Sequence, residues 1–182
     1  FLPNYNVSLA ESIIPAADLS EQISTAGFEA SGTSNMKFGL NGALTIGTLD
    51  GANVEMCERI GAEHMFIFGL SAQQVEQRKR DGAFNAAPDI AASRRLGDVL
   101  QAIRSGVFSH DDPARYTALI DGLIDYDRFL VCADFDAYWD AQARVEALWH
   151  DADAWWRSAV LNSARMAGLP SDRTIRASAT DI

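Results

Sequence analysis

Two short apolar runs, at residues 43–49 and 65–68, constrain the fold of this chain more than any other feature of its sequence. Short runs of this kind, bounded by turn signals, indicate buried strands. Between them, Asp50-Gly51 is a turn signal, and residues 52–59 have the spacing of a short helix that ends near Gly61. We read Phe1-Leu2 as the tail of a further strand. Strands that alternate with helices in this way favour an α/β fold.

The second half of the chain carries helical patterns. Ser71 and Gln74 form a candidate capping box, and Asp112-Pro113 is read as an N-cap followed by proline at the first helical position. Four apolar faces have helical spacing: Leu96, Val99, Leu100 and Ile103; Tyr116, Leu119, Ile120, Leu123 and Ile124; Tyr138, Ala141, Val145, Leu148 and Trp149; and Trp156, Ala159, Val160 and Ala164. We therefore expect an α/β segment over residues 1–70, followed in the same domain by a mainly helical continuation and C-terminal tail over residues 71–182.

Composition and charge exclude several classes of protein. Hydrophobic residues make up 48% of the 182 residues and charged residues 22%, which is typical of a globular chain. The net charge of −10 argues against a nucleic-acid binder, and no apolar run approaches the roughly 20 residues that cross a bilayer. Cys57 and Cys132 are too few for a disulfide framework, so we expect buried thiols in a cytosolic protein. The chain opens on Phe1 with no visible signal peptide, and we expect it to have been cut from a longer protein.

Lys37 is the only lysine or arginine among the first 58 residues, a stretch that also holds seven acidic residues. It follows a loop of small residues, and a helix that starts at about Thr33 would point its free N–H groups into this loop. Such a helix terminus suits a phosphate group, and Thr33 and Lys37 would share one helix face. The position of Lys37 beside Met36 and Phe38 predicts partial burial, which suits an amine that acts as a nucleophile.

Each of these features also has an ordinary structural interpretation. Glycine-rich loops before helices are mostly structural, and most lysines are solvated surface charges. A P-loop is excluded, because Thr33-Ser34 stands where lysine and a hydroxyl residue should follow Gly32. His64, His110 and His150 lack the spacing of metal ligands, so no metal site is expected.

The segment around Lys37 resembles the cofactor segment of the α-glucan phosphorylases, the family that acts on glycogen, starch or maltodextrin. The resemblance spans essentially the whole chain, is dense in the first 70 residues and is patchy from about Ala72 to Ala137. The residues that carry it are Asn4-Tyr5, Val7 to Glu11, Ile14 to Phe38, Leu40 to Thr48, Asp50 to Glu55 and the closing segment Ser171 to Ile175.

This resemblance implies a glycosyltransferase-B architecture with two Rossmann-like domains, of which the chain would supply the end of the C-terminal one and a helical tail. It implies phosphorolysis, in which inorganic phosphate releases a terminal α-1,4-linked glucose as glucose 1-phosphate with retained configuration. The implied cofactor is pyridoxal 5′-phosphate, held as an aldimine on Lys37, whose phosphate relays a proton to the substrate phosphate. The implied full-length protein is a cytoplasmic, allosteric enzyme of glycogen degradation and a homodimer, with α-1,4-glucan and phosphate as substrates.

Site residues follow from the resemblance position by position. Lys37, Thr33, Ser34, Tyr5, Asn6 and Val7 match positions that hold or line the cofactor, and Glu29, Ser31 and Gly32 match positions that contact the transferred glucose. The sequence departs from the family at three positions: Asn6 replaces an arginine of the animal enzymes, Ser34 replaces a glycine, and Phe28 replaces a small polar residue. We expect Ser34 to be helical, because a positive φ would be costly for serine. We expect Phe28 to change the pocket wall.

Other functions stay open from the residues alone. A non-catalytic module could bind a sugar or sugar phosphate through the loop at residues 27–34 without any adduct on Lys37. A different pyridoxal phosphate enzyme, such as an aminotransferase, would need Lys37 to exchange with an amino acid. The resemblance implies that further phosphate-binding cations lie upstream of Phe1, so residues 1–182 alone are expected to be inactive.

Overall fold

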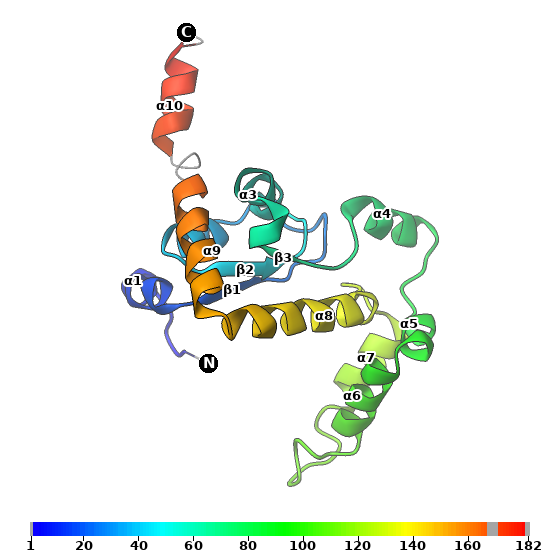
Figure 1. Cartoon of the computed structure of the whole chain (residues 1–182). Helices are drawn as coiled ribbons and strands as arrows, with labels where there is room; N and C mark the ends of the chain where they lie inside the picture. Colours follow the sequence, from blue (N-terminus) through cyan, green and yellow to red (C-terminus); the bar gives the residue numbers. More distant parts are fainter. Residues whose placement is uncertain (1, 167–170, 181–182) are drawn as a thin grey trace.

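A small parallel sheet lies at the centre of the chain. The structure is a computed structural model and describes residues 2–166 and 171–180. The strands β1 (Leu19–Gln22), β2 (Leu44–Gly47) and β3 (Phe66–Ile67) pair in the order β1-β2-β3, with Leu19 opposite Leu44 and Ile46 opposite Phe66. Helices cover both faces of this sheet, as Figure 1 shows. The predicted α/β fold is therefore confirmed.

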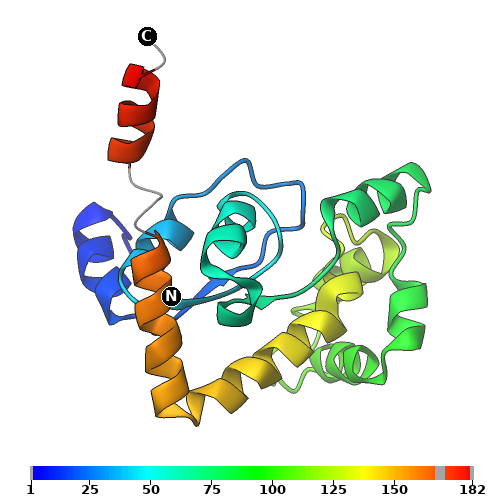
Figure 2. The ribbon, with the colours of Figure 1, turned by 45° about the horizontal axis from the view of Figure 1, so that its top comes forward.

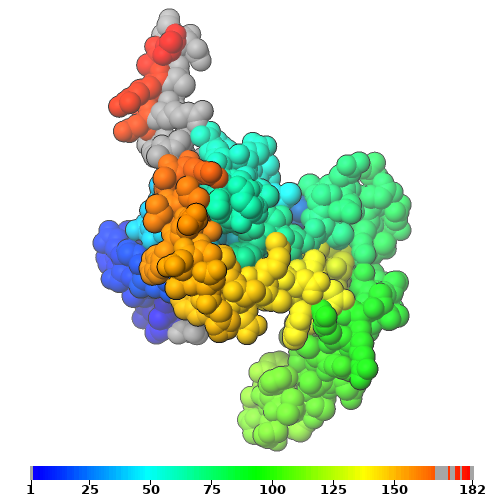
Figure 3. Space-filling model, in the orientation of Figure 1, coloured from blue at the N-terminus to red at the C-terminus, as the bar shows by residue number. Residues whose placement is uncertain are grey.

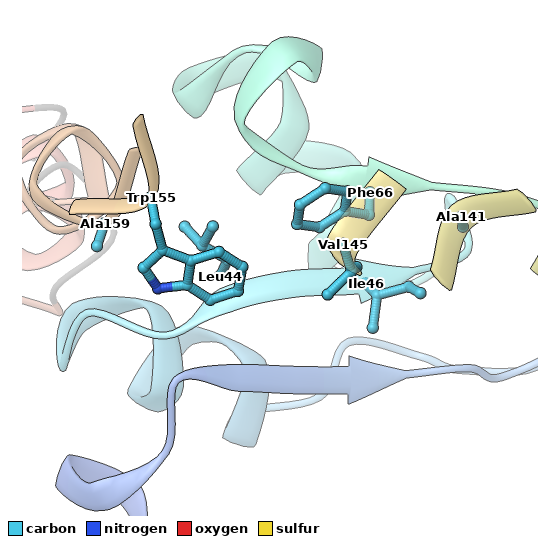
Figure 4. Close-up of a cluster of buried hydrophobic side chains, with 7 residues drawn as sticks. All are labelled: Leu44, Ile46, Phe66, Ala141, Val145, Trp155 and Ala159. Carbon is cyan, nitrogen blue, oxygen red and sulfur yellow. The ribbon is translucent and has the colours of Figure 1, made fainter. Parts of the chain in front are cut away.

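The long helices α8 (Val131–Trp149) and α9 (Ala152–Arg165) pack against one face of the sheet. Leu44 and Ile46 of the central strand are completely buried there, in contact with Val145 of α8 and Trp155 of α9 (Figure 4). Burial of one large apolar side chain stabilises a fold by roughly 1.5–3 kcal/mol. This cluster is therefore the main attachment between the sheet and the C-terminal helices.

The other face carries the helices that follow β1 and β2. These are α2 (Ser34–Leu40) and α3 (Ala52–Ile60), and α3 lies across the sheet from α8 (Figures 1 and 2). All four methionines of the chain meet on this side, in a cluster that joins α2, α3 and the end of α9: Met36, Met56, Met65 and Met166. Gly39 of α2 leaves the space for the Met166 thioether, because a Cβ there would lie 2.3 Å from the sulfur.

A second group of helices projects from the body of the molecule (Figure 3). It consists of α4 (Ala72–Arg80), α5 (Ala87–Ala92), α6 (Arg94–Arg104) and α7 (Thr117–Asp125). Leu96, Leu100 and Ile120 form its own small core together with Cys132 at the start of α8. The remaining elements are α1 (Val7–Ile13), the short 3-10 helices η1 (Ile14–Ala16) and η2 (Ala62–His64), and α10 (Ser171–Thr180).

Several local predictions are confirmed. The two apolar runs form β2 and β3, residues 52–60 form α3 with Gly61 as its C-cap, and Ser71 and Gln74 form the predicted capping box. Cys57 and Cys132 are free thiols, with Cys132 buried and Cys57 partly buried.

Other local predictions are wrong. Leu2 lies outside any strand, and Phe1 lies outside the described residues. Asp112-Pro113 does not start a helix, because α7 begins at Thr117 after successive turns, and Pro113 packs against Gly106 instead. Neither α1 nor β1 was predicted.

The buried face of α9 also differs from the prediction. Trp155, Ser158, Ala159 and Asn162 are buried, whereas Trp156 and Val160 are 63% and 66% exposed. The physical reason is that two polar residues belong to the buried face, and the Oγ of Ser158 lies 3.1 Å from the Nδ1 of His64. Trp155 also stacks edge-on against Trp149, with ring centroids 4.9 Å apart.

The two adjacent tryptophans of α9 give a test of this register. We expect Trp155→Ala to lower the free energy of unfolding by about 3–5 kcal/mol, because it empties a buried core position. Trp156→Ala should change it by less than about 0.5 kcal/mol, because that side chain is exposed. Urea unfolding followed by circular dichroism measures both variants, and a larger loss for Trp156→Ala would contradict the structure.

Candidate functional site

A polar hollow of about 210 Å³ opens at the carboxyl ends of β1 and β2. In parallel α/β sheets, ligands bind at this edge, where loops leave the strands. The hollow brings together four of the residues that the sequence predicted as site residues: Glu29, Ser31, Gly32 and Ser34. Its other lining residues are Glu21, Gln22, Ile23, Ser24, Asn35, Asp50 and Asn53.

Asp50, just after β2, holds the first part of the loop at residues 24–32. Its Oδ1 accepts a hydrogen bond from the Gly27 amide at 2.8 Å, and its Oδ2 accepts one from the Glu29 amide at 2.8 Å. The Ser24 hydroxyl donates to the same Oδ2 at 3.0 Å. Hydrogen bonds to an ionised acceptor are shorter and stronger than neutral ones. One buried carboxylate therefore fixes three points of the loop.

These contacts decide the ionisation of Asp50. Burial on its own raises the pKa of the carboxyl. The hydrogen bonds, led by those from the backbone of Glu29 and Gly27, outweigh burial, and the pKa lies below its ordinary value of 3.8. Asp50 is therefore a carboxylate at neutral pH.

The residues after Asp50 hold the second part of the loop. The Ala52 amide donates to the Ser31 carbonyl at 2.6 Å, and a Cβ on Gly51 would lie 2.4 Å from that carbonyl oxygen. Asn53 accepts from the Asn35 side chain at 2.9 Å and donates to the Thr48 carbonyl at 3.0 Å. Residues 48–53 therefore fix both the loop and the start of α2.

Ser34 is the first residue of α2 and Thr33 its N-cap, as predicted to within one residue. Thr33 makes no side-chain capping bond, and the first helical hydrogen bond runs from the Lys37 amide to the Thr33 carbonyl at 3.1 Å. Ser34 has a helical conformation, which confirms the expectation for this departure from the family. The Met36 amide is already bound by the Asn35 side chain at 2.9 Å.

Lys37 is exposed, so the prediction that it is partly buried is wrong for the described chain. The physical reason is the orientation of α2, whose buried face carries Asn35 and Gly39, four residues apart. Lys37 lies outside the lining of the hollow, and Thr33 does so as well.

Tyr5, Asn6 and Val7 lie at the start of α1 and do not line the hollow. Asn6 is the N-cap of α1: its Oδ1 accepts from the Leu9 amide at 3.0 Å, and its Nδ2 donates to the Asn4 carbonyl at 3.1 Å. Tyr5 and Val7 are exposed. The structure thus brings Ser34 together with the predicted sugar contacts, but it does not bring residues 5–7 into the hollow.

Two further side chains of the loop have clear positions. The Glu29 carboxylate is exposed, and its single protein hydrogen bond among the described residues is a long one, 3.4 Å from the Ser31 amide. Phe28 does not line the hollow, so the expected change of the pocket wall is not found. Its ring packs edge-on against Phe129, and the Lys79 ammonium lies 4.1 Å from the ring centroid.

Sequence reasoning missed Asp50, Asn35 and Asn53 as residues that shape the site. Asp50-Gly51 was interpreted as a turn, and Asp50, Asn35 and Asn53 were counted in the family resemblance without a role in the site, although their polar side chains are all buried. The available signal was a set of polar residues next to buried strands, because buried polar groups require hydrogen-bond partners.

The described residues, 2–166 and 171–180, offer neither a cluster of metal ligands nor a membrane-spanning helix. No three His, Cys, Asp or Glu side chains gather there in a way that would hold a metal ion. No helix there is both long and apolar enough to cross a membrane.

These features define a class: an α/β protein with a ligand hollow at the carboxyl ends of parallel strands, formed largely by a glycine-rich loop. The family model described as carbohydrate phosphorylase matches residues 1–182. The chain is 52% identical over 182 residues to a glycogen phosphorylase of Synechocystis sp., and 51% identical over 182 residues to the brain form of glycogen phosphorylase of Bos taurus. It is 50% identical over 176 residues, or 97% of its length, to a glycogen phosphorylase of Haemophilus influenzae.

The chain therefore belongs to the carbohydrate phosphorylase family. The first two matches cover 100% of the chain, but only 21% and 22% of those relatives, and the third covers 21% of its relative. The chain thus spans about a fifth of the length of these relatives.

The depressed pKa of Asp50 predicts how stability depends on pH. A carboxylate whose folded pKa is lowered stabilises the fold above its unfolded pKa, and this contribution is lost as pH falls through the folded pKa. We expect Asp50→Asn to cost about 1–3 kcal/mol at neutral pH, because one backbone amide loses its acceptor. This cost should shrink as pH falls below about 4, the pKa of aspartate in the unfolded chain, and through the lower pKa of folded Asp50.

Asp134 provides a control of opposite sign, because burial raises its pKa even though it accepts a hydrogen bond from the Leu70 amide at 2.8 Å. As pH falls through that raised value, wild type should gain stability relative to Asp134→Asn. Urea unfolding of the three proteins across this pH range measures both trends, and a cost of Asp50→Asn that grows in acid would contradict this assignment.

Proposed function

We propose that the complete protein is a pyridoxal-phosphate-dependent α-glucan phosphorylase. It transfers terminal α-1,4-linked glucose units to inorganic phosphate and releases glucose 1-phosphate with retained configuration. The observation that carries this proposal is that Glu29, Ser31, Gly32 and Ser34 meet in one polar hollow, in a chain that belongs to the carbohydrate phosphorylase family. The relatives named above are glycogen phosphorylases, which supports a glucan as substrate.

Glu29, Ser31 and Gly32 are the proposed contacts to the transferred glucose. The Glu29 carboxylate is exposed at the hollow and retains acceptor capacity. A carboxylate binds sugar hydroxyl groups strongly, because these hydrogen bonds are charge-assisted. Ser31 and Gly32 belong to the same fixed loop, so all three would face one sugar ring.

The residues of α2 fit a covalently held cofactor that carries a phosphate group. Lys37 presents an exposed amine, and it is the only cation in the first 58 residues. Gly32 has a φ of 83°, a conformation that favours glycine and lets the backbone approach a ligand closely. Thr33 and Ser34 begin α2, where backbone amides have no helical partner, and are the proposed holders of the cofactor phosphate.

The proposed cofactor supplies a phosphate group that exchanges a proton with the substrate phosphate. Lys37 is its covalent anchor and takes no part in amine exchange. Tyr5 and Val7, with their exposed side chains, are the proposed border of the cofactor. The Asn6 side chain already caps α1. We therefore propose that Asn6 borders the cofactor without donating a side-chain hydrogen bond to it.

The remaining partners are α-1,4-glucan, inorganic phosphate, the rest of the phosphorylase chain and a second copy in a homodimer. Glycogen, starch and maltodextrin are the candidate glucans. We propose a cytoplasmic, allosteric enzyme of glycogen degradation, and the two free cysteines agree with a reducing compartment.

The chain has two lysines, Lys37 and Lys79, and this gives a direct test of the anchor. After borohydride reduction of the complete native protein, we expect peptide mapping to find one phosphopyridoxyl group, on Lys37. Lys79 serves as the internal control, because its ammonium lies against the Phe28 ring. Lys37→Arg should abolish the modification, and Lys79→Arg should leave it intact. An unmodified Lys37 would reject the phosphorylase proposal and favour a non-catalytic sugar-binding module.

Charge predicts that residues 1–182 alone do not catalyse phosphorolysis. Two phosphate groups would meet at the site, each with close to two negative charges, and Lys37 cannot neutralise both. We expect no glucose 1-phosphate from this chain with glycogen, phosphate and pyridoxal phosphate, while the complete protein forms it under the same conditions. Phosphorolysis by the chain alone would contradict this prediction.

A further inference from the structure

Asp50 is almost fully buried, with 6% of its surface exposed, and its carboxylate accepts three hydrogen bonds. Two of its three donors are backbone amides, those of Gly27 and Glu29, each at 2.8 Å. The second amide belongs to the residue that is the proposed glucose contact. Asp50 thus holds the main chain of Glu29 itself.

The support of Asp50 is rigid. It follows the completely buried strand β2, and its amide donates to the Thr48 carbonyl at 2.9 Å. The Thr48 side chain is buried and donates to the Ser24 carbonyl at 2.6 Å. The loop is therefore attached, through Asp50 and Thr48, to a strand that is completely buried.

The ionised state of Asp50 also matters for Glu29. An ionised carboxylate has no proton to donate, so it accepts from the Glu29 backbone but cannot bind the Glu29 side chain. The Glu29 carboxylate is therefore left available on the side of the hollow, where it is exposed.

We infer that Asp50 is a positioning residue for glucose recognition, which fixes the first part of the loop so that Glu29 faces the transferred sugar. This inference rests on the proposed function. Asp50 lines the hollow, but its three hydrogen bonds all come from the loop, so we assign it a role that acts through the main chain of Glu29. Correct placement of binding groups matters strongly, because a misplacement of about 1 Å can cost about 100-fold in rate.

The test uses the complete protein with its cofactor and Asp50→Asn as the main variant. Asparagine has the same shape, but its amide group turns a donor toward one of the two backbone amides, whichever way it is oriented. We expect kcat/KM for glycogen to fall by about 10- to 100-fold. The phosphopyridoxyl group on Lys37 should stay at one per chain.

Asp134→Asn is the matched structural control. Asp134 is also a buried carboxylate that accepts from a backbone amide, that of Leu70, but it lies outside the hollow. It should lose stability while kcat/KM stays within about twofold of wild type. Equal kinetic effects of the two variants would overturn the positioning role.

A double-mutant cycle with Glu29→Gln separates positioning from a general structural effect. If Asp50 acts through Glu29, Asp50→Asn should reduce kcat/KM by less than about threefold when Glu29→Gln is already present. Independent, multiplicative effects would overturn the inference.

A second variant keeps the inference testable if Asp50→Asn does not accumulate as a folded protein. Ser24→Ala removes only the hydroxyl donor to Asp50, and we expect it to lower kcat/KM by about threefold. Unchanged kinetics in that case would overturn the inference.

A wild-type protein without phosphorolysis or without cofactor on Lys37 would instead reject the proposed function. If the wild type is active and neither the Asp50 nor the Ser24 variant changes kcat/KM, only the role of Asp50 is rejected.

Discussion

The burial of β2 on both faces is the constraint on which the rest of the structure depends. Leu44 and Ile46 face α8 and α9, while Thr45, on the alternate side of the strand, is also completely buried. A strand covered on both sides cannot move without opening two layers of helices at once. The carboxyl end of β2 is therefore held in place. It also holds the residues that follow the strand, Thr48 to Asn53.

The candidate site is built outward from this point. The loop at residues 24–32 contains four glycine or serine residues and no strand or helix of its own, so its conformation has to be imposed from outside. Asp50 and Ala52 impose it through hydrogen bonds, and Asn53 extends the same support to Asn35 in α2. Residues 48–53 thus support both the proposed sugar contacts and the proposed cofactor helix α2. This shared support is a physical reason why the two lie next to each other in the sequence.

The sequence predicted the elements whose signals are local. The apolar runs of β2 and β3 and the capping box at Ser71 depend on neighbouring residues only, and they were found. The strand β1 was missed because Ser20, Glu21 and Gln22 are polar, and their pairing with β2 is a long-range contact. The buried face of α9 was misassigned because it includes Ser158 and Asn162, which a search for apolar periodicity places outside.

In the site, too, residues close together in the sequence were predicted, whereas long-range contacts were missed. Glu29, Ser31, Gly32 and Ser34 were assigned through the family resemblance, and the structure places all four around one hollow. The role of Asp50 was missed because its hydrogen-bond partners lie more than 20 positions away, so a polar residue beside a buried strand did not reveal what it binds. The exposure of Lys37 depends on how α2 is rotated on the core, which its apolar neighbours do not specify.

The packing of α2 against the core determines how the helix could carry a bulky group on Lys37. The helix rests on methionine side chains, and Gly39 lies directly against the thioether of Met166. Methionine is unbranched, with three rotatable bonds and a polarizable sulfur, so it adapts to small displacements without leaving voids. The first turn of α2 is tied to Asn53 by a hydrogen bond from Asn35, and the last turn, which carries Lys37, is tied to α9 by a hydrogen bond from the Ser163 hydroxyl to the Gly39 carbonyl at 3.2 Å. Both ends of the helix are therefore held by hydrogen bonds, and the methionine layer against which it packs can adapt to small changes without breaking them.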